Sequence, residues 1–243
     1  MILENKVVII SGASKRFGEA TANLFLKEGA KVIILSRNDE RIRDITTKTN
    51  GKILGIKCDV TNRDEVKKSL ERVAEIYGKI DVLFNNAGGK YSKKQKMYEM
   101  EYDFWDEVIK TNLKSLFVLS KEVIPYMQKG GSIINISAAN KTLLDSNTAY
   151  AAAKSGIIGL TKNLARELRE YNIRVNCIRP GVIRTEFDSR NFEEMPSEIK
   201  RKGVSEDVAH AALYLASNNS SWITGQTFVV DGGESLFLDM ERV

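Results

Sequence analysis

Short apolar runs alternate along the chain with longer segments whose apolar residues recur at helical spacing. The runs that predict strands cover residues 5–12, 31–37, 52–60, 80–88, 131–137, 173–181 and 225–233. The segments that predict helices cover residues 17–30, 38–50, 62–78, 102–127 and 148–171. Strands without polar alternation are typical of a parallel sheet covered on both faces. Right-handed crossovers then give an α/β, doubly wound parallel sheet of about seven strands with helices on both faces.

One segment interrupts this alternation. Residues 188–203 are polar, include a proline and lack a buried strand. Because no linker or internal repeat divides the chain, we expect a single domain over residues 1–243. Within it, residues of about 186–203 are predicted to form a flap over the ligand crevice, with a surface helix as the alternative.

Composition narrows the class of protein. The chain is 42% apolar and 28% charged, as soluble globular proteins are. Its two cysteines, Cys58 and Cys177, are isolated in apolar runs, which favours a reducing, cytoplasmic location over a disulfide framework. No signal region or apolar run of ~20 residues predicts a membrane segment.

The charged residues and the histidine limit the chemistry further. The net charge of +5 comes from basic residues dispersed among acidic ones, which predicts a solvated surface and no nucleic-acid partner. His210 is the only histidine, so mechanisms that need two are excluded. Since the cysteines are isolated too, no metal site is expected.

The first predicted strand leads into a glycine loop. Gly12 ends the strand and Gly18 opens the following helix. Backbone N–H groups at a helix N-terminus attract a pyrophosphate, as in the dinucleotide-binding Rossmann fold. A glycine at a strand-to-helix turn is a weak signal alone, but its place in the first βαβ unit strengthens it.

The end of the second strand indicates which dinucleotide binds. Sites for NAD usually offer a carboxylate there to the ribose hydroxyls, whereas a basic residue fits a 2′-phosphate. Arg37 holds this position, and Lys15 in the glycine loop faces the same region, so NADP(H) is favoured over NAD(H). In the alternative, Arg37 is merely solvated and Asp39 serves NAD.

A tyrosine, a lysine and a serine suggest acid–base chemistry. Tyr150 and Lys154 lie four residues apart on a predicted helix and share a face. An adjacent ammonium stabilises a phenolate, lowers the tyrosine pKa and brings proton transfer closer to neutrality. Ser137, after a strand, faces the crevice and can hold a carbonyl oxygen. Otherwise the pair is a surface contact and the serine a helix cap.

Seven motifs occur together in one order: the glycine loop, the Asn-Asn-Ala-Gly of residues 85–88, Asn112, Ser137, the Tyr-Ala-Ala-Ala-Lys of residues 150–154, and residues 179–185 and 223–233. This combination resembles the short-chain dehydrogenase/reductase family over nearly the whole chain. The resemblance implies an NADP-dependent enzyme that transfers hydride between nicotinamide and a ketone or secondary alcohol. It also implies a homotetramer.

The resemblance implies four catalytic roles. Tyr150 is the expected general acid/base, Lys154 lowers its pKa and binds the nicotinamide ribose, Ser137 orients the substrate oxygen and Asn112 positions a relay water. The expected cofactor-binding residues are Gly12, Ser14, Lys15, Arg16, Phe17, Gly18, Ser36, Arg37, Asp59, Val60, Asn86, Ala87, Gly88, Tyr150, Lys154, Pro180, Gly181, Ile183 and Thr185.

Arg16 departs from the family pattern, because it stands where the loop usually has its middle glycine. It either blocks the pyrophosphate or binds it directly. The loop also resembles that of pteridine reductases, in which the arginine reaches cofactor and substrate. That branch, however, typically has an aspartate at the position of Ser137.

The resemblance implies that the substrate pocket is built from the segments after Gly88 and after Ser137 and from the flap, here residues 89–100, 138–148 and 186–203. These residues do not identify the substrate, so several substrates stay open.

The nearest resemblance is to 3-oxoacyl-carrier-protein reductases and to carbonyl or sugar dehydrogenases. Carrier-protein reductases usually have a basic docking residue where this chain has Tyr171, although Arg169 and Arg174 are close. Dihydropterin reduction is a further alternative. A non-catalytic NADP-binding sensor or scaffold, from another class of protein, would bind dinucleotide without turnover.

Overall fold

The computed structural model describes residues 1–13, 16–89, 95–183, 199, 201 and 203–237. Its strands are β1 Val7–Ser11, β2 Lys31–Ser36, β3 Ile53–Lys57, β4 Ile80–Asn85, β5 Met127–Ile136, β6 Arg174–Pro180 and β7 Thr227–Val230. Its α-helices are α1 Arg16–Lys27, α2 Asp39–Lys48, α3 Arg63–Tyr77, α4 Tyr102–Ile109, α5 Ser115–Val123, α6 Asn140–Leu144, α7 Thr148–Glu167 and α8 Ser205–Ala216. A π-helical turn, Lys110–Lys114, joins α4 to α5, and short 3₁₀ turns cover Met97–Glu99, Ile124–Tyr126, Asn218–Ser220 and Glu234–Phe237.

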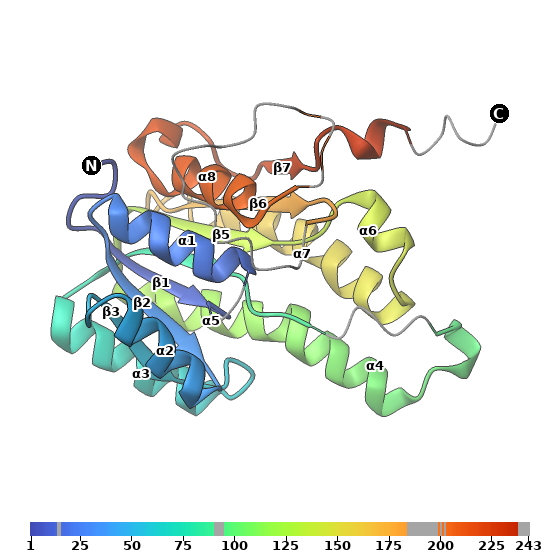
Figure 1. Ribbon diagram of the computed structural model, residues 1–243, viewed down its shortest axis with the longest axis horizontal. Helices are drawn as coiled ribbons and strands as arrows, with labels where there is room; N and C mark the ends of the chain where they lie inside the picture. Colours follow the sequence, from blue (N-terminus) through green and yellow to red (C-terminus); the bar gives the residue numbers. More distant parts are fainter. Residues whose placement is uncertain (14–15, 90–94, 184–198, 200, 202, 238–243) are drawn as a thin grey trace.

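The strands form one parallel sheet in the order β3-β2-β1-β4-β5-β6-β7 (Figure 1). The chain runs outward from β1 to β3 and then returns to place β4 on the other side of β1. This reversal separates the connections after β1 and β4 and opens a crevice at the carboxyl ends of these strands, where such sheets bind ligands. The predicted doubly wound fold is confirmed.

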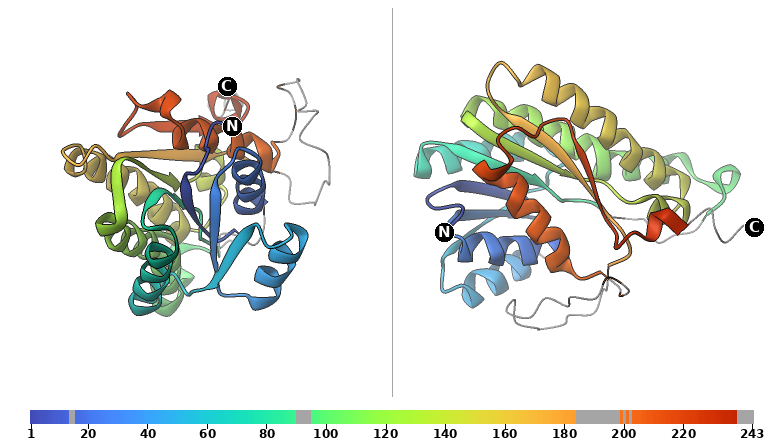
Figure 2. Two further views of the ribbon diagram at one scale, coloured as in Figure 1. Left: turned by 90° about the vertical axis from the view of Figure 1, so that its left-hand side faces the viewer. Right: turned by 90° about the horizontal axis from the view of Figure 1, so that it is seen from above.

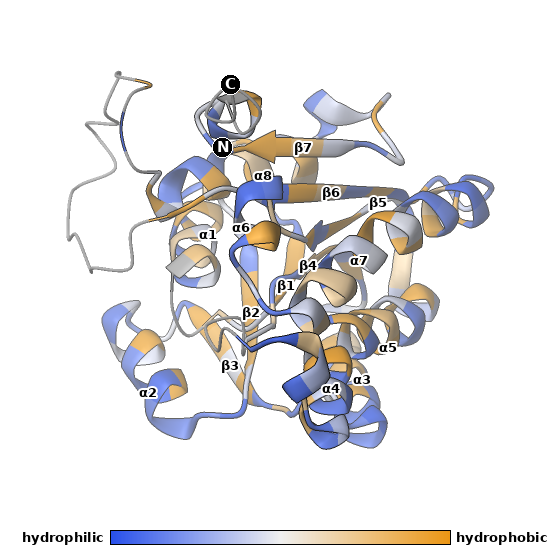
Figure 3. Ribbon diagram, turned by 90° about the vertical axis from the view of Figure 1, so that its right-hand side faces the viewer, coloured by the Kyte–Doolittle hydropathy of each residue, from blue (hydrophilic) through white to orange (hydrophobic). Residues whose placement is uncertain are grey.

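Successive residues of the strands face opposite sides of the sheet, and each side has its own core. Val8 and Ile10 pack with residues of α1 and α8 on one face, whereas Val7 and Ile9 pack with α3 and α5 on the other. Figure 2 shows the two helical layers on either side of the sheet. In Figure 3 the strands are largely apolar and the outer surface of α2 is polar. Double-sided burial thus explains the continuous apolar strands of the sequence.

Several predicted boundaries differ from the structure. The helix expected over residues 102–127 is divided by the π-helical turn, and β5 begins at Met127 rather than at residue 131. Both α6 and α8 were missed. The start of helix α8 is held by the carboxylate of Asp207. It accepts a hydrogen bond from the N–H of Val204 at 2.8 Å and one from each Nη atom of Arg201 at 2.7 Å.

Two further sequence predictions concern the flap and membrane-spanning segments. Most of the predicted flap, residues 186–203, lies outside the described residues, so the flap stays a prediction. Among the residues that the structure describes, no helix combines the length and the apolar character that crossing a membrane requires.

Candidate active site

The turn after β1 is locked against the loop after β4. Asn86 donates from Nδ2 to the carbonyl of Gly12 at 2.9 Å, and the hydroxyl of Ser11 accepts the N–H groups of Asn86 and Ala87 at 3.1 Å each. Gly12 has φ +68°, and a Cβ there would lie 2.8 Å from the Cα of Ala87. Only glycine fits this close approach of two loops at the reversal point of the sheet.

Gly18 makes the start of α1 equally compact. A Cβ on Gly18 would lie 2.6 Å from both the carbonyl oxygen of Gly12 and the Cα of Ala13. Arg16 is the first residue of α1, but its side chain, like Ser14 and Lys15 as a whole, lies outside the described part of the structure. Both readings of Arg16 therefore stay predictions.

Lys154 is buried at the centre of the site. Its Nζ donates to the carbonyl of Ile136, the last residue of β5, at 2.9 Å and lies 5.7 Å from the centre of the Tyr150 ring. Burial lowers the pKa of Lys154 to about 8, because the ammonium is removed from water. Asn147 fixes the start of α7 by accepting the N–H of Tyr150 at 2.9 Å. The tyrosine and the lysine therefore share a firmly anchored helix.

Ser137 lies at the end of β5 beside this pair, but its hydroxyl points into the protein. It donates to the carbonyl of Lys154 at 2.6 Å, and its backbone N–H donates to Ile178 at 2.9 Å. The hydroxyl oxygen keeps lone pairs that can accept a hydrogen bond, whereas donation to a substrate requires a rotation of the side chain. The expected orienting role thus stays a prediction.

Asn112 ties the loop after β4 to the catalytic region. Its Nδ2 donates to the carbonyls of Gly89 at 3.0 Å and Val108 at 2.9 Å, and its Oδ1 accepts the N–H of Gly89 at 3.0 Å. A Cβ on Gly88 would lie 2.8 Å from this Oδ1 and 3.4 Å from the Nζ of Lys154. The π-helical turn thereby brings Asn112, the glycines and the lysine together. The role of Asn112 in positioning a relay water stays a prediction.

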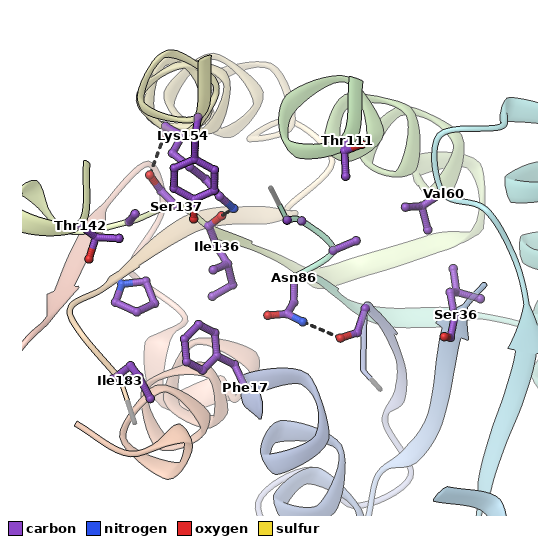
Figure 4. Close-up of a pocket in the computed structure, with 18 of the residues that line it drawn as sticks. Phe17, Ser36, Val60, Asn86, Thr111, Ile136, Ser137, Thr142, Lys154 and Ile183 are labelled. Carbon is purple, nitrogen blue, oxygen red and sulfur yellow. Dashed lines mark hydrogen bonds between the residues drawn. The ribbon is translucent and has the colours of Figure 1, made fainter. Parts of the chain in front are cut away.

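A cavity of about 770 Å³ extends along the carboxyl edge of the sheet (Figure 4). In Figure 4 Ser36 and Val60 lie at one end, Asn86 and Ile136 in the middle, and Ser137, Lys154 and Thr142 at the other. The predicted site residues that line it are Gly12, Phe17, Ser36, Arg37, Asp59, Val60, Asn86, Ala87, Gly88, Ser137, Tyr150, Lys154, Pro180, Gly181 and Ile183. Gly18 and Asn112 stand behind this lining, and Thr185 lies outside the described residues.

Other lining residues were not singled out from the sequence. They are Leu35, Asn38, Cys58, Thr61, Gly89, Thr111, Ile136, Ala138, Thr142, Asp145 and Val182. Most are sequence neighbours of predicted residues, and extending each motif by one or two positions would have found them. Thr142 and Asp145 instead belong to the unpredicted helix α6 and its end. The resemblance placed their segment, residues 138–148, in the substrate pocket, but no motif identified these two residues within it.

The Ser36–Val60 end of the cavity carries an ion pair. Nη1 of Arg37 lies 3.9 Å from Oδ2 of Asp59. Burial opposes ionisation of Asp59, but hydrogen bonds from the backbone and hydroxyl of Thr61, and then Arg37, outweigh it and lower its pKa. Asp39, the alternative ribose partner, instead binds Lys57 at 2.6 Å and is not among the described lining residues.

The residues fit a bound nicotinamide dinucleotide. The cavity is within the size range of cofactor sites and runs past a helix N-terminus, with a cationic side chain at one end and the Tyr150–Lys154 pair at the other. The described residues contain no cluster of three or more His, Cys, Asp or Glu side chains suited to a metal ion.

The sequence profile of a family described as "Enoyl-(Acyl carrier protein) reductase" matches residues 12–235. A solved structure of a double mutant of a Serratia marcescens short-chain dehydrogenase/reductase is similar over 97% of this chain and 100% of its own, with a TM-score of 0.84 and 30% identity. The chain belongs to the short-chain dehydrogenase/reductase family. It is accordingly an oxidoreductase of ketone and alcohol groups, as the resemblance predicted.

Curated members of this short-chain dehydrogenase/reductase family differ in their named activities. The chain is 39% identical to 3-oxoacyl-[acyl-carrier-protein] reductase of Thermotoga maritima, over 96% of this chain and 99% of the relative. It is 41% identical to the enzyme of the same name from Chlamydia pneumoniae, over 95% and 97%. It is also 33% identical to an NAD-dependent glycerol dehydrogenase of Listeria innocua, over 96% and 95%. Family membership therefore leaves the substrate and the choice between NAD and NADP open.

Proposed function

We propose that the protein is an NADP(H)-dependent reductase of 3-oxoacyl thioesters, such as those of a carrier protein. The observation that supports it best is the placement of Ser137, Tyr150 and Lys154 at one end of a dinucleotide-sized cavity that has Arg37 at the other end. One cavity thus offers both a cofactor site and a proton donor.

Each catalytic residue has a stated task in this proposal. The nicotinamide ring, when bound, supplies the hydride that reaches the carbonyl carbon. Tyr150 gives its phenolic proton to the carbonyl oxygen, and the nearby Nζ of Lys154 stabilises the phenolate that remains. Ser137 binds the same oxygen after its hydroxyl turns toward the cavity. Alcohol oxidation uses these steps in reverse.

Asn112 acts behind this pair. Because its side chain holds both backbone groups of Gly89, it keeps the loop beside Lys154 in place. Reprotonation of Tyr150 through a water near Asn112, as the family resemblance implies, completes the proposed cycle.

The preference for NADP(H) rests on Arg37. Its guanidinium lines the cavity, and its Nη1 lies 3.9 Å from Oδ2 of Asp59, which is too far for a hydrogen bond. The guanidinium can therefore turn to a 2′-phosphate. Lys15 is proposed as the second cation. The engagement of Asp39 by Lys57 supports this choice over the NAD alternative.

The thioester is favoured by the identities to two reductases with that named substrate. The two arginines considered for docking a carrier protein differ in their exposure. Arg174 is buried and donates to Ser220 at 2.8 Å and to the carbonyl of Ser217 at 3.1 Å, so it serves the fold. Arg169 is exposed beside Tyr171 and remains available for a carrier protein.

A polyol is the second candidate substrate, because the similar Listeria protein is named a glycerol dehydrogenase. Sugar dehydrogenation belongs to the same chemical class. Reduction of a dihydropterin depends on Arg16 and stays a prediction, and the non-catalytic sensor is the outcome expected if dinucleotide binds without turnover.

We also propose a homotetramer located in the cytoplasm. Trp222 is 98% exposed and Val229 lies half-exposed on the edge strand β7, as expected for surfaces that another subunit covers. The two cysteines are unpaired, which suits a reducing compartment. Light scattering after gel filtration measures the oligomeric state.

One screen tests the proposed function. NADPH and NADH are each oxidised in the presence of acetoacetyl-CoA, dihydroxyacetone, an aldose or a dihydropterin. We expect the highest kcat/KM with NADPH and acetoacetyl-CoA, and a loss of about 10²–10⁴-fold in Tyr150→Phe. Equal rates in wild type and Tyr150→Phe would overturn the mechanism, and a preference for NADH would overturn the role of Arg37. Tyr126→Phe, at a tyrosine outside the cavity lining, is the matched control.

A further inference from the structure

We propose that Asp145 and Thr142 select the substrate by accepting an N–H or O–H group beside the reacting carbonyl and by rejecting a carboxylate there. This inference rests on the proposed function, because it concerns the substrate half of the same cavity. Thr142 lies on α6 and Asp145 directly follows that helix. Three residues apart, the two side chains project from one side of the helix. We call them the polar corner.

Helix α6 holds the polar corner in a fixed position. Leu143, on another side of the helix, packs into the apolar cluster that contains Tyr150 and Ala138. The hydroxyl of Ser146 donates to the carbonyl of Leu143 at 2.7 Å. Because the same cluster contains the catalytic tyrosine, the corner cannot shift far without displacing the reacting centre.

The charges around the corner are largely engaged elsewhere. Lys141 binds Glu234 at 2.6 Å, and Arg179 donates to the carbonyl of Ala138 at 2.8 Å. Asp145 itself has no ion pair or side-chain hydrogen bond with the residues that the structure describes. Its carboxylate therefore adds a negative potential at this corner, which attracts hydrogen-bond donors and repels anions.

Thr142 adds an unsatisfied hydroxyl. Its Oγ1 is shielded from solvent and has no hydrogen-bond partner among the residues that the structure describes. The residue itself lines the cavity and lies beside Ser137 in Figure 4. Rotation about Cα–Cβ exchanges the hydroxyl with the methyl group and turns the oxygen toward a ligand. Since a buried hydroxyl without a partner is costly, a substrate that offers a partner favours this rotation.

Two substrate sources offer the required donor. The arm of a thioester carries an amide N–H about four bonds beyond the thioester carbonyl and about six from the reacting ketone carbon. A polyol carries a hydroxyl on the carbon next to its carbonyl. The corner is apolar on its other side, where Pro180, Val182 and Ile183 line the cavity, so a donor on a partly apolar chain matches it. A free 3-oxo acid would place its carboxylate against Asp145 and bind poorly.

The test compares four ketones with NADPH. They are the acetoacetyl thioester of N-acetylcysteamine (amide donor), dihydroxyacetone (hydroxyl donor), ethyl acetoacetate (no donor) and acetoacetate (carboxylate). We expect Asp145→Asn to lower kcat/KM about tenfold for the donor substrate that the enzyme uses, mainly through KM. Ethyl acetoacetate should change less than about twofold, and acetoacetate should improve.

Thr142→Val separates binding from folding. It removes a buried hydroxyl without a partner, so we expect an unchanged or higher Tm together with a loss of about threefold or more in kcat/KM for the donor substrate alone. Glu71→Gln, on the exposed side of α3, is the control for loss of one carboxylate. Which donor substrate loses rate distinguishes the amide from the hydroxyl.

Equal changes for all four ketones, or no change for the donor substrate, would overturn the polar corner. The proposed function is judged separately from the wild type. If wild type turns over dihydroxyacetone but not the thioester, the thioester proposal fails while the selectivity of Asp145→Asn still tests the corner.

Discussion

The two ends of the cavity are built in different ways. At one end the side chain of Arg37 is 69% exposed and its partner Asp59 33% exposed, and they approach only to 3.9 Å. At the other end Ser137, Lys154 and Asn112 are buried, each with hydrogen bonds of 3.0 Å or less. The buried end holds reacting groups in place, whereas the exposed end can change partners at little cost. Substitutions at the buried end should therefore lower the reaction rate strongly. Substitutions at the exposed end should change mainly the preference between NADP and NAD.

The largest effect is expected from Lys154→Met. Removing the ammonium beside Tyr150 should lower kcat/KM by about 10²–10⁴-fold, because the phenolate loses its only adjacent charge in the described lining. Steady-state kinetics with NADPH measures this loss. Lys162→Met, on an exposed side of the same helix, is the control. A loss smaller than tenfold would show that the buried end is less critical than its packing implies.

Next in size is the destabilisation expected from Asn112→Leu. It leaves the half-buried N–H and carbonyl of Gly89 and the buried carbonyl of Val108 without their partners, so the free energy of unfolding should fall by about 3 kcal/mol. Urea denaturation measures it. Asn163→Leu, which removes one exposed hydrogen bond to Gly159, should cost less than about 0.5 kcal/mol. Similar costs for both variants would contradict the comparison.

A pH effect of intermediate size follows from the pKa of Lys154. Since the folded protein lowers this pKa to about 8, the unfolded chain binds more protons above pH 8, and stability should rise with pH there. The slope is at most about 1.4 kcal/mol per pH unit. Burial raises the pKa of Cys177 to about 11, which makes stability fall above pH 9 as the unfolded thiol ionises. The rise in the free energy of unfolding is thus confined to about pH 8–9.

Urea titrations of wild type and Lys154→Met at several pH values isolate this contribution. The free-energy difference between the two proteins should change in favour of wild type between pH 8 and 9. A difference that stays constant with pH would mean that the lysine keeps its ordinary pKa in the fold.

The smallest effect is expected at the exposed end. Arg37→Ala should raise the KM for NADPH about three- to tenfold and leave that for NADH nearly unchanged, because only a 2′-phosphate uses the guanidinium. Arg43→Ala, exposed on α2, controls for loss of charge. Equal changes with both cofactors would assign Arg37 to the fold rather than to cofactor choice.

Much of this molecule was predictable from its apolar pattern. All seven strands were expected, because parallel strands buried on both faces leave continuous apolar runs such as residues 31–37. Helix α8 was missed although its residues Val208, Ala212 and Leu215 are buried. It follows a polar segment and its small alanines give a weak apolar signal, so only packing against the sheet makes it recognisable.

The site shows a similar limit. Motif order identified Tyr150 and Lys154, and the structure places them together. The order of the motifs could not predict that the Ser137 hydroxyl donates to the carbonyl of Lys154, because the direction of a hydroxyl depends on neighbours that are distant in sequence. The segment of residues 138–148 was expected in the substrate pocket, but only the position of α6 at the cavity wall identifies Thr142 and Asp145 within it.

The π-helical turn at Lys110–Lys114 also bears on how this chain can diverge. Such turns accommodate one more residue than an α-helical turn does. Thr111 faces the cavity and Asn112 holds Gly89 from this turn. Deleting one residue here would restore a regular α-helix and remove the extra residue that lets Thr111 face the cavity while Asn112 holds Gly89. Loops elsewhere can tolerate insertions and deletions, but this helix should not. We therefore expect related proteins to keep its length.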